Sequence, residues 1–186
     1  MYFKNAGKLN TDQTIELAIK RAKELKITNI VVASNQGDSA KKLLPYKNDF
    51  NIVCVTHHVG FREPGSDEMD TSTRKMLQDE GIKILTTTHL LAGVDRGVRN
   101  HFGGVYPAEI IAQTLRILGQ GTKVAVEISV MALDAGLIPH DEEILAVAGT
   151  ARGLDTAIII SPAHANHFFN TEIKEIICMP RNKKVE

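Results

Sequence analysis

The sequence has no excess of charge of either sign, with 22 Lys and Arg residues against 22 Asp and Glu residues in a chain of 186. Nucleic acids and anionic membrane surfaces usually require a basic footprint, so we expect neither as a partner. No apolar run approaches the roughly 18 residues that cross a bilayer. The first residues also lack the apolar stretch of a signal peptide. We therefore expect a cytoplasmic protein, and the length suits a single domain over residues 1–186.

Cysteine is scarce, and the histidines are poorly spaced for a metal. The two cysteines, Cys54 and Cys178, lie inside apolar runs, where thiols pack as small hydrophobic groups and form no disulfide framework. The adjacent histidines at 57–58 would point apart in an extended segment. The His-x-x-His pair at 164–167 has no carboxylate or cysteine at a matching spacing. We therefore expect no bound metal.

Three familiar catalytic or nucleotide-binding motifs are missing. No Gly-Lys-Ser/Thr follows a glycine-rich loop, so hydrolysis of a nucleoside triphosphate is not supported. There is no G-x-G-x-x-G dinucleotide fingerprint and no G-x-S-x-G nucleophile elbow. With no visible nucleophile or metal cluster, a hydrolase or transferase acting on phosphate esters is disfavoured.

Apolar runs rich in β-branched residues alternate with helical patterns along the chain. The predicted strands cover residues 30–33, 51–56, 82–87, 144–148, 156–160 and 174–179. The predicted helices cover residues 11–25, 37–44, 70–79, 107–118 and 122–137. This alternation predicts an α/β fold of three α/β/α layers around a mostly parallel sheet. Only a short loop precedes the last strand, which makes that strand a candidate for an antiparallel edge.

The segments that follow the predicted strands are rich in hydroxyl groups, glycines and imidazoles. They cover residues 34–39, 56–61, 86–89, 149–153 and 161–164. In sheets of this kind, ligands bind outside the carboxyl ends of the strands. The convergence of several polar loops therefore predicts one common site for a small molecule.

The first of these loops suggests a phosphate site. Ser34 and Ser39 offer hydroxyl groups, Gly37 permits close approach of the backbone, and a helix start would present free N–H groups. The competing interpretation is that Ser34 or Ser39 only caps the helix. Asp38 counts against an anion, because its carboxylate would compete for the same helix end.

Other charged residues near strand ends also need an explanation. Arg152 lies between two glycines, where it either closes on a phosphate or is an ordinary surface side chain. Glu127 and Asp134 fall on an apolar helical stripe, and a buried carboxylate needs a partner. For Glu127 the candidates are Arg152, a lysine or a ligand hydroxyl. His57 and His89 follow strand ends, where they are placed to hydrogen-bond a ligand or move protons.

The segment at residues 30–40, IVVASNQGDSA, resembles the strand–loop–helix opening of the pyruvate kinase C-terminal domain. In that enzyme the equivalent loop holds an effector's sugar phosphate. Nearly the whole chain is similar to a stand-alone prokaryotic family named after that domain. The similarity is carried by VTHHVGF at 55–61, LAGVDR at 91–96, FGG at 102–104, GQGTKVAVE at 119–127 and GTARGLDTA at 149–157.

Members of that family look like binders of flavin mononucleotide (FMN) with no assigned reaction. The resemblance implies that the phosphate lies among Ser34, Asn35, Gly37 and Ser39. It implies that the ribityl chain or flavin ring lies near Thr56, His57, Thr87, His89, Gly149, Thr150 and Arg152.

The leading hypothesis is therefore an FMN-binding protein, with a flavin-dependent oxidoreductase as one outcome and His57 or His89 as proton donor. The alternative is a non-catalytic sensor or regulatory module for a phosphorylated metabolite. The catalytic barrel of pyruvate kinase is missing from this sequence, so kinase activity is not expected. A homo-oligomer is expected for an enzyme of this size.

Overall fold

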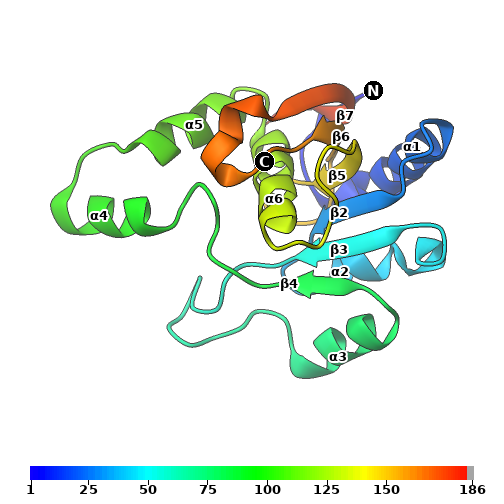
Figure 1. Ribbon diagram of the computed structural model, residues 1–186, viewed down its shortest axis with the longest axis horizontal. Helices are drawn as coiled ribbons and strands as arrows, with labels where there is room; N and C mark the ends of the chain where they lie inside the picture. Colours follow the sequence, from blue (N-terminus) through cyan, green and yellow to red (C-terminus); the bar gives the residue numbers. More distant parts are fainter. Residues whose placement is uncertain (184–186) are drawn as a thin grey trace.

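The computed structural model describes residues 1–183. The strands in this part of the chain are β1 (Tyr2–Asn5), β2 (Asn29–Ala33), β3 (Asn51–Val55), β4 (Lys83–Leu85), β5 (Ile144–Ala148), β6 (Thr156–Ser161) and β7 (Glu172–Asn182). The helices are α1 (Thr11–Glu24), α2 (Asp38–Lys41), α3 (Thr71–Asp79), α4 (Val94–Phe102), α5 (Pro107–Arg116) and α6 (Gln120–Asp134), with short 3₁₀ turns η1 (Lys8–Asn10), η2 (Leu44–Tyr46) and η3 (Ala165–Asn170). Figure 1 shows their arrangement.

Within residues 1–183 the strands form one seven-stranded sheet in the order β1-β7-β6-β5-β2-β3-β4. All neighbouring pairs are parallel except those that β6 makes with β5 and β7. The predicted α/β class with a mostly parallel sheet is confirmed. The last strand does run antiparallel to its neighbour β6, but β1 pairs with its other side. The reversed strand is therefore β6, which lies inside the sheet.

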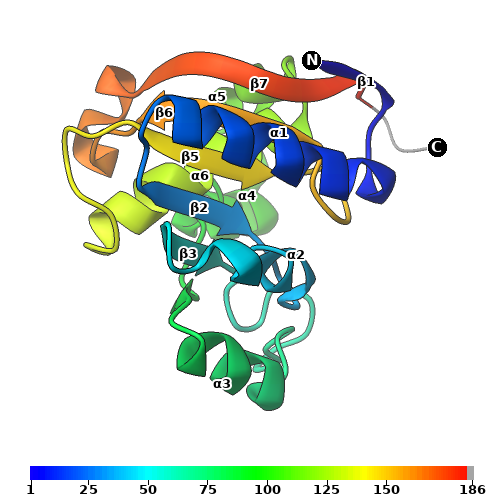
Figure 2. The same cartoon turned by 90° about the vertical axis from the view of Figure 1, so that its right-hand side faces the viewer.

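The sheet separates two apolar layers. Side chains alternate along each strand, so in β2 Val31 faces one layer while Ile30 and Val32 face the other. One layer packs against α1, α2 and α3, and the other against α6 (Figure 2). β2 and β5 lie in the middle of the sheet, and their apolar side chains are almost fully buried. Burial of each such Val, Ile or Leu contributes about 1.5–3 kcal/mol.

Helix α6 is buried along most of its length. Every residue from Gly121 to Leu133 is buried except Val124. A helix that is apolar on nearly all sides must be covered on all sides. It packs against β2, β5 and β6 on one side and against α5 on the other. This position brings one side of α6 to the carboxyl ends of the parallel strands.

Two elements were not predicted from the sequence. β1 is a short, partly polar strand that pairs only with β7 at the edge of the sheet. α4 contains Gly97 and has no buried residue, although Val94, Val98 and Phe102 recur at the spacing of an amphipathic helix. Together with α5 it extends away from the sheet (Figure 1), with apolar side chains such as Phe102 exposed. No helix in residues 1–183 has both the length and the apolar character needed to cross a membrane.

Candidate functional site

A cavity of about 310 Å³ lies at the carboxyl ends of the parallel strands β2, β3 and β5, and α6 forms one of its walls. Eight of the eleven predicted site residues line it: Ser34, Asn35, Ser39, Thr56, His57, His89, Gly149 and Arg152. Gly37, Thr87 and Thr150 do not line it. The polar segments after four of the strands therefore meet, as their position in the sheet predicts.

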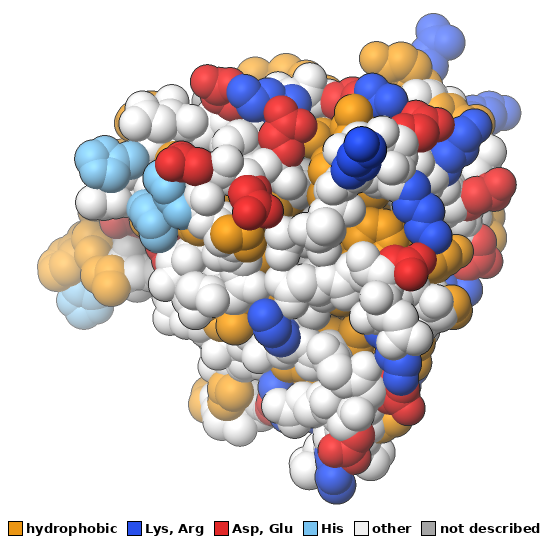
Figure 3. Space-filling model, turned by 45° about the vertical axis from the view of Figure 1, so that its right-hand side comes forward, with side chains coloured by type: hydrophobic (Ala, Val, Ile, Leu, Met, Phe, Trp, Pro, Cys, Tyr) orange, Lys and Arg blue, Asp and Glu red, His pale blue; other side chains and the backbone are white. Residues whose placement is uncertain are grey.

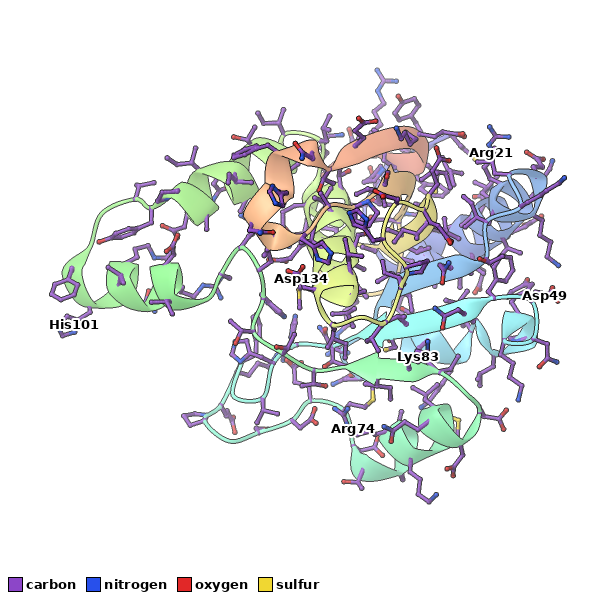
Figure 4. All side chains as sticks on the ribbon, viewed as in Figure 1. Arg21, Asp49, Arg74, Lys83, His101 and Asp134 are labelled. Atoms are coloured by element: carbon purple, nitrogen blue, oxygen red, sulfur yellow. The ribbon has the colours of Figure 1, made fainter. Side chains whose placement is uncertain are left out.

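The segment after β6 does not join this cavity. β6 runs opposite to its neighbours, so Ser161 and the residues after it lie at the other end of the sheet. There His164 Nδ1 lies 2.7 Å from a carboxylate oxygen of Asp134, near the end of α6 (Figure 4). Asp134 is therefore half-exposed and does not share the buried face of Glu127. Within residues 1–183, no three His, Cys, Asp or Glu side chains gather as a metal site would require.

The loop after β2 is built largely by its own contacts. Ser34 Oγ accepts hydrogen bonds from the backbone N–H groups of Ser39, at 3.1 Å, and Ala40, at 3.4 Å. α2 is only four residues long. These hydrogen bonds agree with the interpretation that Ser34 caps the helix. They occupy backbone N–H groups that would have to be free to bind a phosphate.

The local structure requires a glycine at position 37. Its φ of +88° is one that residues with a Cβ rarely adopt, and a Cβ there would lie 2.6 Å from Thr73 Cγ2. The glycine is buried against α3 and does not line the cavity. Gly37 therefore allows the backbone to pack closely against α3, not against a ligand. The sequence alone did not show that contact.

The loop after β5 is held by Asp155, which the sequence analysis did not single out. One carboxylate oxygen accepts from the N–H groups of Gly7, at 2.9 Å, and Thr150, at 3.1 Å. The other accepts from the Thr156 hydroxyl at 2.8 Å. Asp155 is fully buried. The signal that could have identified it was a buried polar residue directly before an apolar strand. Thr150 Oγ1 is buried without a hydrogen-bond partner in this part of the chain.

Arg152 lies at the exposed tip of this loop and reaches the neighbouring one. Its Nη1 donates to Gln36 Oε1 at 2.7 Å. Gly149 and Gly153 let the loop close tightly, because a Cβ on Gly149 would lie 2.3 Å from the Gly153 carbonyl oxygen. The two loops that flank the cavity are therefore joined by a guanidinium group.

Aromatic rings gather on the β3–β4 side of the cavity. The rings of His57 and Phe61 are stacked with centroids 3.7 Å apart, and His89 lies 5.3 Å from His57. His57 Nδ1 lies 2.6 Å from Glu68 Oε1, and Arg62 Nε lies 3.3 Å from the other Glu68 oxygen. Burial is the main cause that lowers the pKa of His89 to about 4, so at neutral pH this imidazole is uncharged.

A buried ion pair lies in the α6 wall. Lys123 Nζ bonds to Glu127 Oε2, and Glu127 Oε1 accepts from the Leu91 N–H at 2.9 Å. Only 5% of Lys123 and 3% of Glu127 are exposed. Of the three partners predicted for Glu127, the structure contains the lysine. Burial lowers the pKa of Lys123, and the positive charges of Arg116 and Arg96 add to that effect, while Glu127 opposes it.

The cavity is more basic than the chain as a whole. Five basic and three acidic side chains line it, whereas on the face shown in Figure 3 both signs are intermixed. Among residues 1–183, Arg96, Arg116 and Arg152 have no carboxylate ion-pair partner. Arg96 was missed because α4 was not predicted, whereas Arg116 lies on the predicted helix α5, whose position beside the cavity is known only from the folded chain.

The family model described as "Pyruvate kinase, alpha/beta domain" matches residues 12–160. The chain belongs to this family. The matched range runs from α1 into β6 and includes every residue that lines the cavity. In this member of the pyruvate kinase alpha/beta domain family, β1 and β7 lie outside the matched range.

Proposed function

We propose that the cavity binds an anionic small molecule with a flat ring, and that FMN is this ligand. The observation that carries the proposal is that one cavity holds both an aromatic cluster and, on the loop after β5, Arg152, which has no carboxylate partner among residues 1–183. The rings of His57, Phe61 and His89 offer stacking partners for a flat heterocycle. Arginine binds phosphate oxygens in a bidentate manner.

The residues of the two flanking loops suit the phosphate end of such a ligand. Arg152 brings a charged donor to the loop after β2, where Asn35 and Ser39 add an amide and a hydroxyl group. In this proposal an arginine must bind the phosphate, because Ser34 Oγ already accepts hydrogen bonds from the N–H groups at the start of α2. The loop residues then hold the phosphate by side chains, and the His57 side of the cavity receives the ring.

A bound flavin would supply hydride and electron transfer, which no protein side chain provides. In the oxidoreductase form of this proposal, His57 is the proton donor to the reacting atom. Its Nδ1 bond with Glu68 fixes the orientation of the ring and leaves Nε2 as the nitrogen that meets a ligand.

The second candidate function is a non-catalytic module that senses a phosphorylated metabolite. The polar loops and arginines would serve a sugar phosphate as well as a flavin phosphate. The two functions differ in the use of the aromatic cluster, which a sugar phosphate does not require.

A titration with three ligands tests the proposal. FMN, riboflavin and ribose 5-phosphate are each added to the whole protein, and binding is followed by flavin fluorescence or, for the sugar phosphate, by calorimetry. We expect FMN to bind at least tenfold more tightly than either of the others. Tighter binding of ribose 5-phosphate than of FMN would support the sensor and overturn the flavin.

A matched pair of variants locates the ligand. Arg152→Gln is expected to weaken FMN binding at least tenfold. Lys20→Gln removes the same charge from an exposed position on α1, away from the cavity, and is expected to leave binding unchanged. Equal affinities for the two variants would show that Arg152 does not hold the phosphate.

A further inference from the structure

A second, smaller cavity of about 160 Å³ adjoins the first between α4 and α5. Arg96, Arg99 and Arg116 line it, together with Glu109. Arg96 and Arg116 line both cavities, so their side chains stand where the two spaces meet. The residues proposed to hold the phosphate of FMN, which are Asn35, Ser39 and Arg152, do not line this smaller cavity.

The positive charge in this corner is only partly balanced. Arg99 is paired with Glu109. Arg116 Nε donates to the neutral amide oxygen of Gln120 at 2.7 Å, and Arg96 has no carboxylate partner among the described residues. Both arginines are half-buried. Charge that is partly removed from water favours the binding of an opposite charge.

The nearest buried carboxylate cannot supply that opposite charge. Both oxygens of Glu127 are in use, one by Lys123 and the other by the Leu91 N–H. The ion pair of Lys123 and Glu127 contributes one charge of each sign, so the α6 wall does not offset the charges of Arg96 and Arg116. Among residues 1–183, the only carboxylate that lines this cavity is that of Glu109, which is paired with Arg99.

We propose that Arg96 and Arg116 form an anion subsite that binds the carboxylate or phosphate group of a second small molecule. The planar guanidinium group matches both oxyanions with paired N–H donors. The subsite opens into the main cavity, so the rest of that molecule extends toward the aromatic cluster. This inference rests on the proposed function, because the second molecule is defined as one bound beside the flavin.

Calorimetry with inorganic phosphate and with acetate tests the subsite, and the protein is first saturated with FMN. We expect Arg96→Gln and Arg116→Gln each to weaken binding of at least one of these anions tenfold or more. Lys20→Gln controls for the loss of one charge. The double variant Lys75→Gln with Asp79→Asn removes an exposed ion pair on α3, away from both cavities, without a change of net charge, and is expected to bind within twofold of wild type. Unfolding curves establish that each variant is folded.

The outcomes separate this inference from the proposed function. Anion binding that is unchanged in both single arginine variants overturns the subsite. FMN binding that is weakened tenfold or more in both Arg96→Gln and Arg116→Gln also overturns it, because these arginines would then hold the phosphate of FMN itself. If FMN does not bind, the titrations are made without it. Anion binding that needs Arg96 and Arg116 but survives Arg152→Gln would then support the subsite, while the flavin proposal fails.

Discussion

At the scale of single residues, the buried charged groups hold the loops of the site in place. Asp155 joins the loop after β5 to the segment before α1, through the N–H groups of Gly7 and Thr150. Thr11 adds a second link, because its hydroxyl accepts from the Leu154 N–H at 3.0 Å. The position of Arg152 thus depends on residues far from it in sequence.

Loss of the Asp155 carboxylate leaves several buried donors without an acceptor. We expect Asp155→Ala to lower the free energy of unfolding by about 3 kcal/mol, since each unsatisfied buried group costs about 1–3 kcal/mol. Urea denaturation measures this. Asp12→Ala is the control, because it removes an exposed carboxylate paired only with Lys42, and such surface pairs contribute roughly 0–1 kcal/mol. Similar small effects in both variants would contradict the role given to Asp155.

The two thiols are expected to be unreactive in the folded protein. Burial raises the pKa of Cys54 to about 12 and that of Cys178 to about 11, so almost no thiolate forms at pH 8. A disulfide reagent that reports thiols by colour should find none in the native protein and both in urea. Rapid labelling without denaturant would show that one of the two strands opens readily.

At the scale of elements, local sequence patterns predicted most helices and strands and a mostly parallel sheet, but not that β6 is the reversed strand. The alternation of apolar runs with helical stripes located α1, α3, α5 and α6. The reversal of β6 depends on its pairing with β5 and β7, which are brought together only by the complete sheet. α4 was missed although its apolar residues recur at helical spacing, because the glycine inside it lowers the helix propensity of a short segment.

Two glycines in different elements test these packing arguments. Gly37→Ala places a methyl group against Thr73 and Leu77 at a φ of +88°, so it is expected to destabilise the protein by about 1–3 kcal/mol. Gly97→Ala adds a methyl group to open space in α4 and should be neutral or stabilising by up to about 1 kcal/mol. Thermal unfolding compares them. Equal stability of the two variants would refute the packing of Gly37 on α3.

At the scale of the whole molecule, the position of the site was predicted better than its charge. The rule that ligands meet the carboxyl ends of parallel strands brought together His57, His89 and Arg152. Arg96 and Lys123 were not foreseen as site residues. One lies on the unpredicted α4, and the other lies in an apolar helix whose burial is known only from the folded chain. The expected homo-oligomer stays a prediction, which a mass measurement in solution checks.

The stability of the whole protein is expected to fall in mild acid because of His89. Its pKa is lowered from 6.5 to about 4 by burial and by nearby positive charges, while the unfolded chain keeps the ordinary value. The unfolded state therefore gains a proton first, and the free energy of unfolding decreases as the pH falls from 6.5 toward 4.

Urea titrations at several pH values in this range measure the effect. His89→Gln should remove part of the pH dependence, whereas the exposed His101→Gln on α4 should not (Figure 4). A pH dependence that is the same in all three proteins would contradict the assignment to His89.

The pairing of β1 with β7 has a consequence for the order of events during synthesis. These strands join residues as far apart as Asn5 and Asn182, which are separated by 177 positions. β1 is made first, yet its only partner in the sheet is the last strand. While the chain grows on the ribosome, residues 2–5 must wait with unpaired backbone groups until β7 emerges. Completion of this sheet edge therefore follows the synthesis of β7.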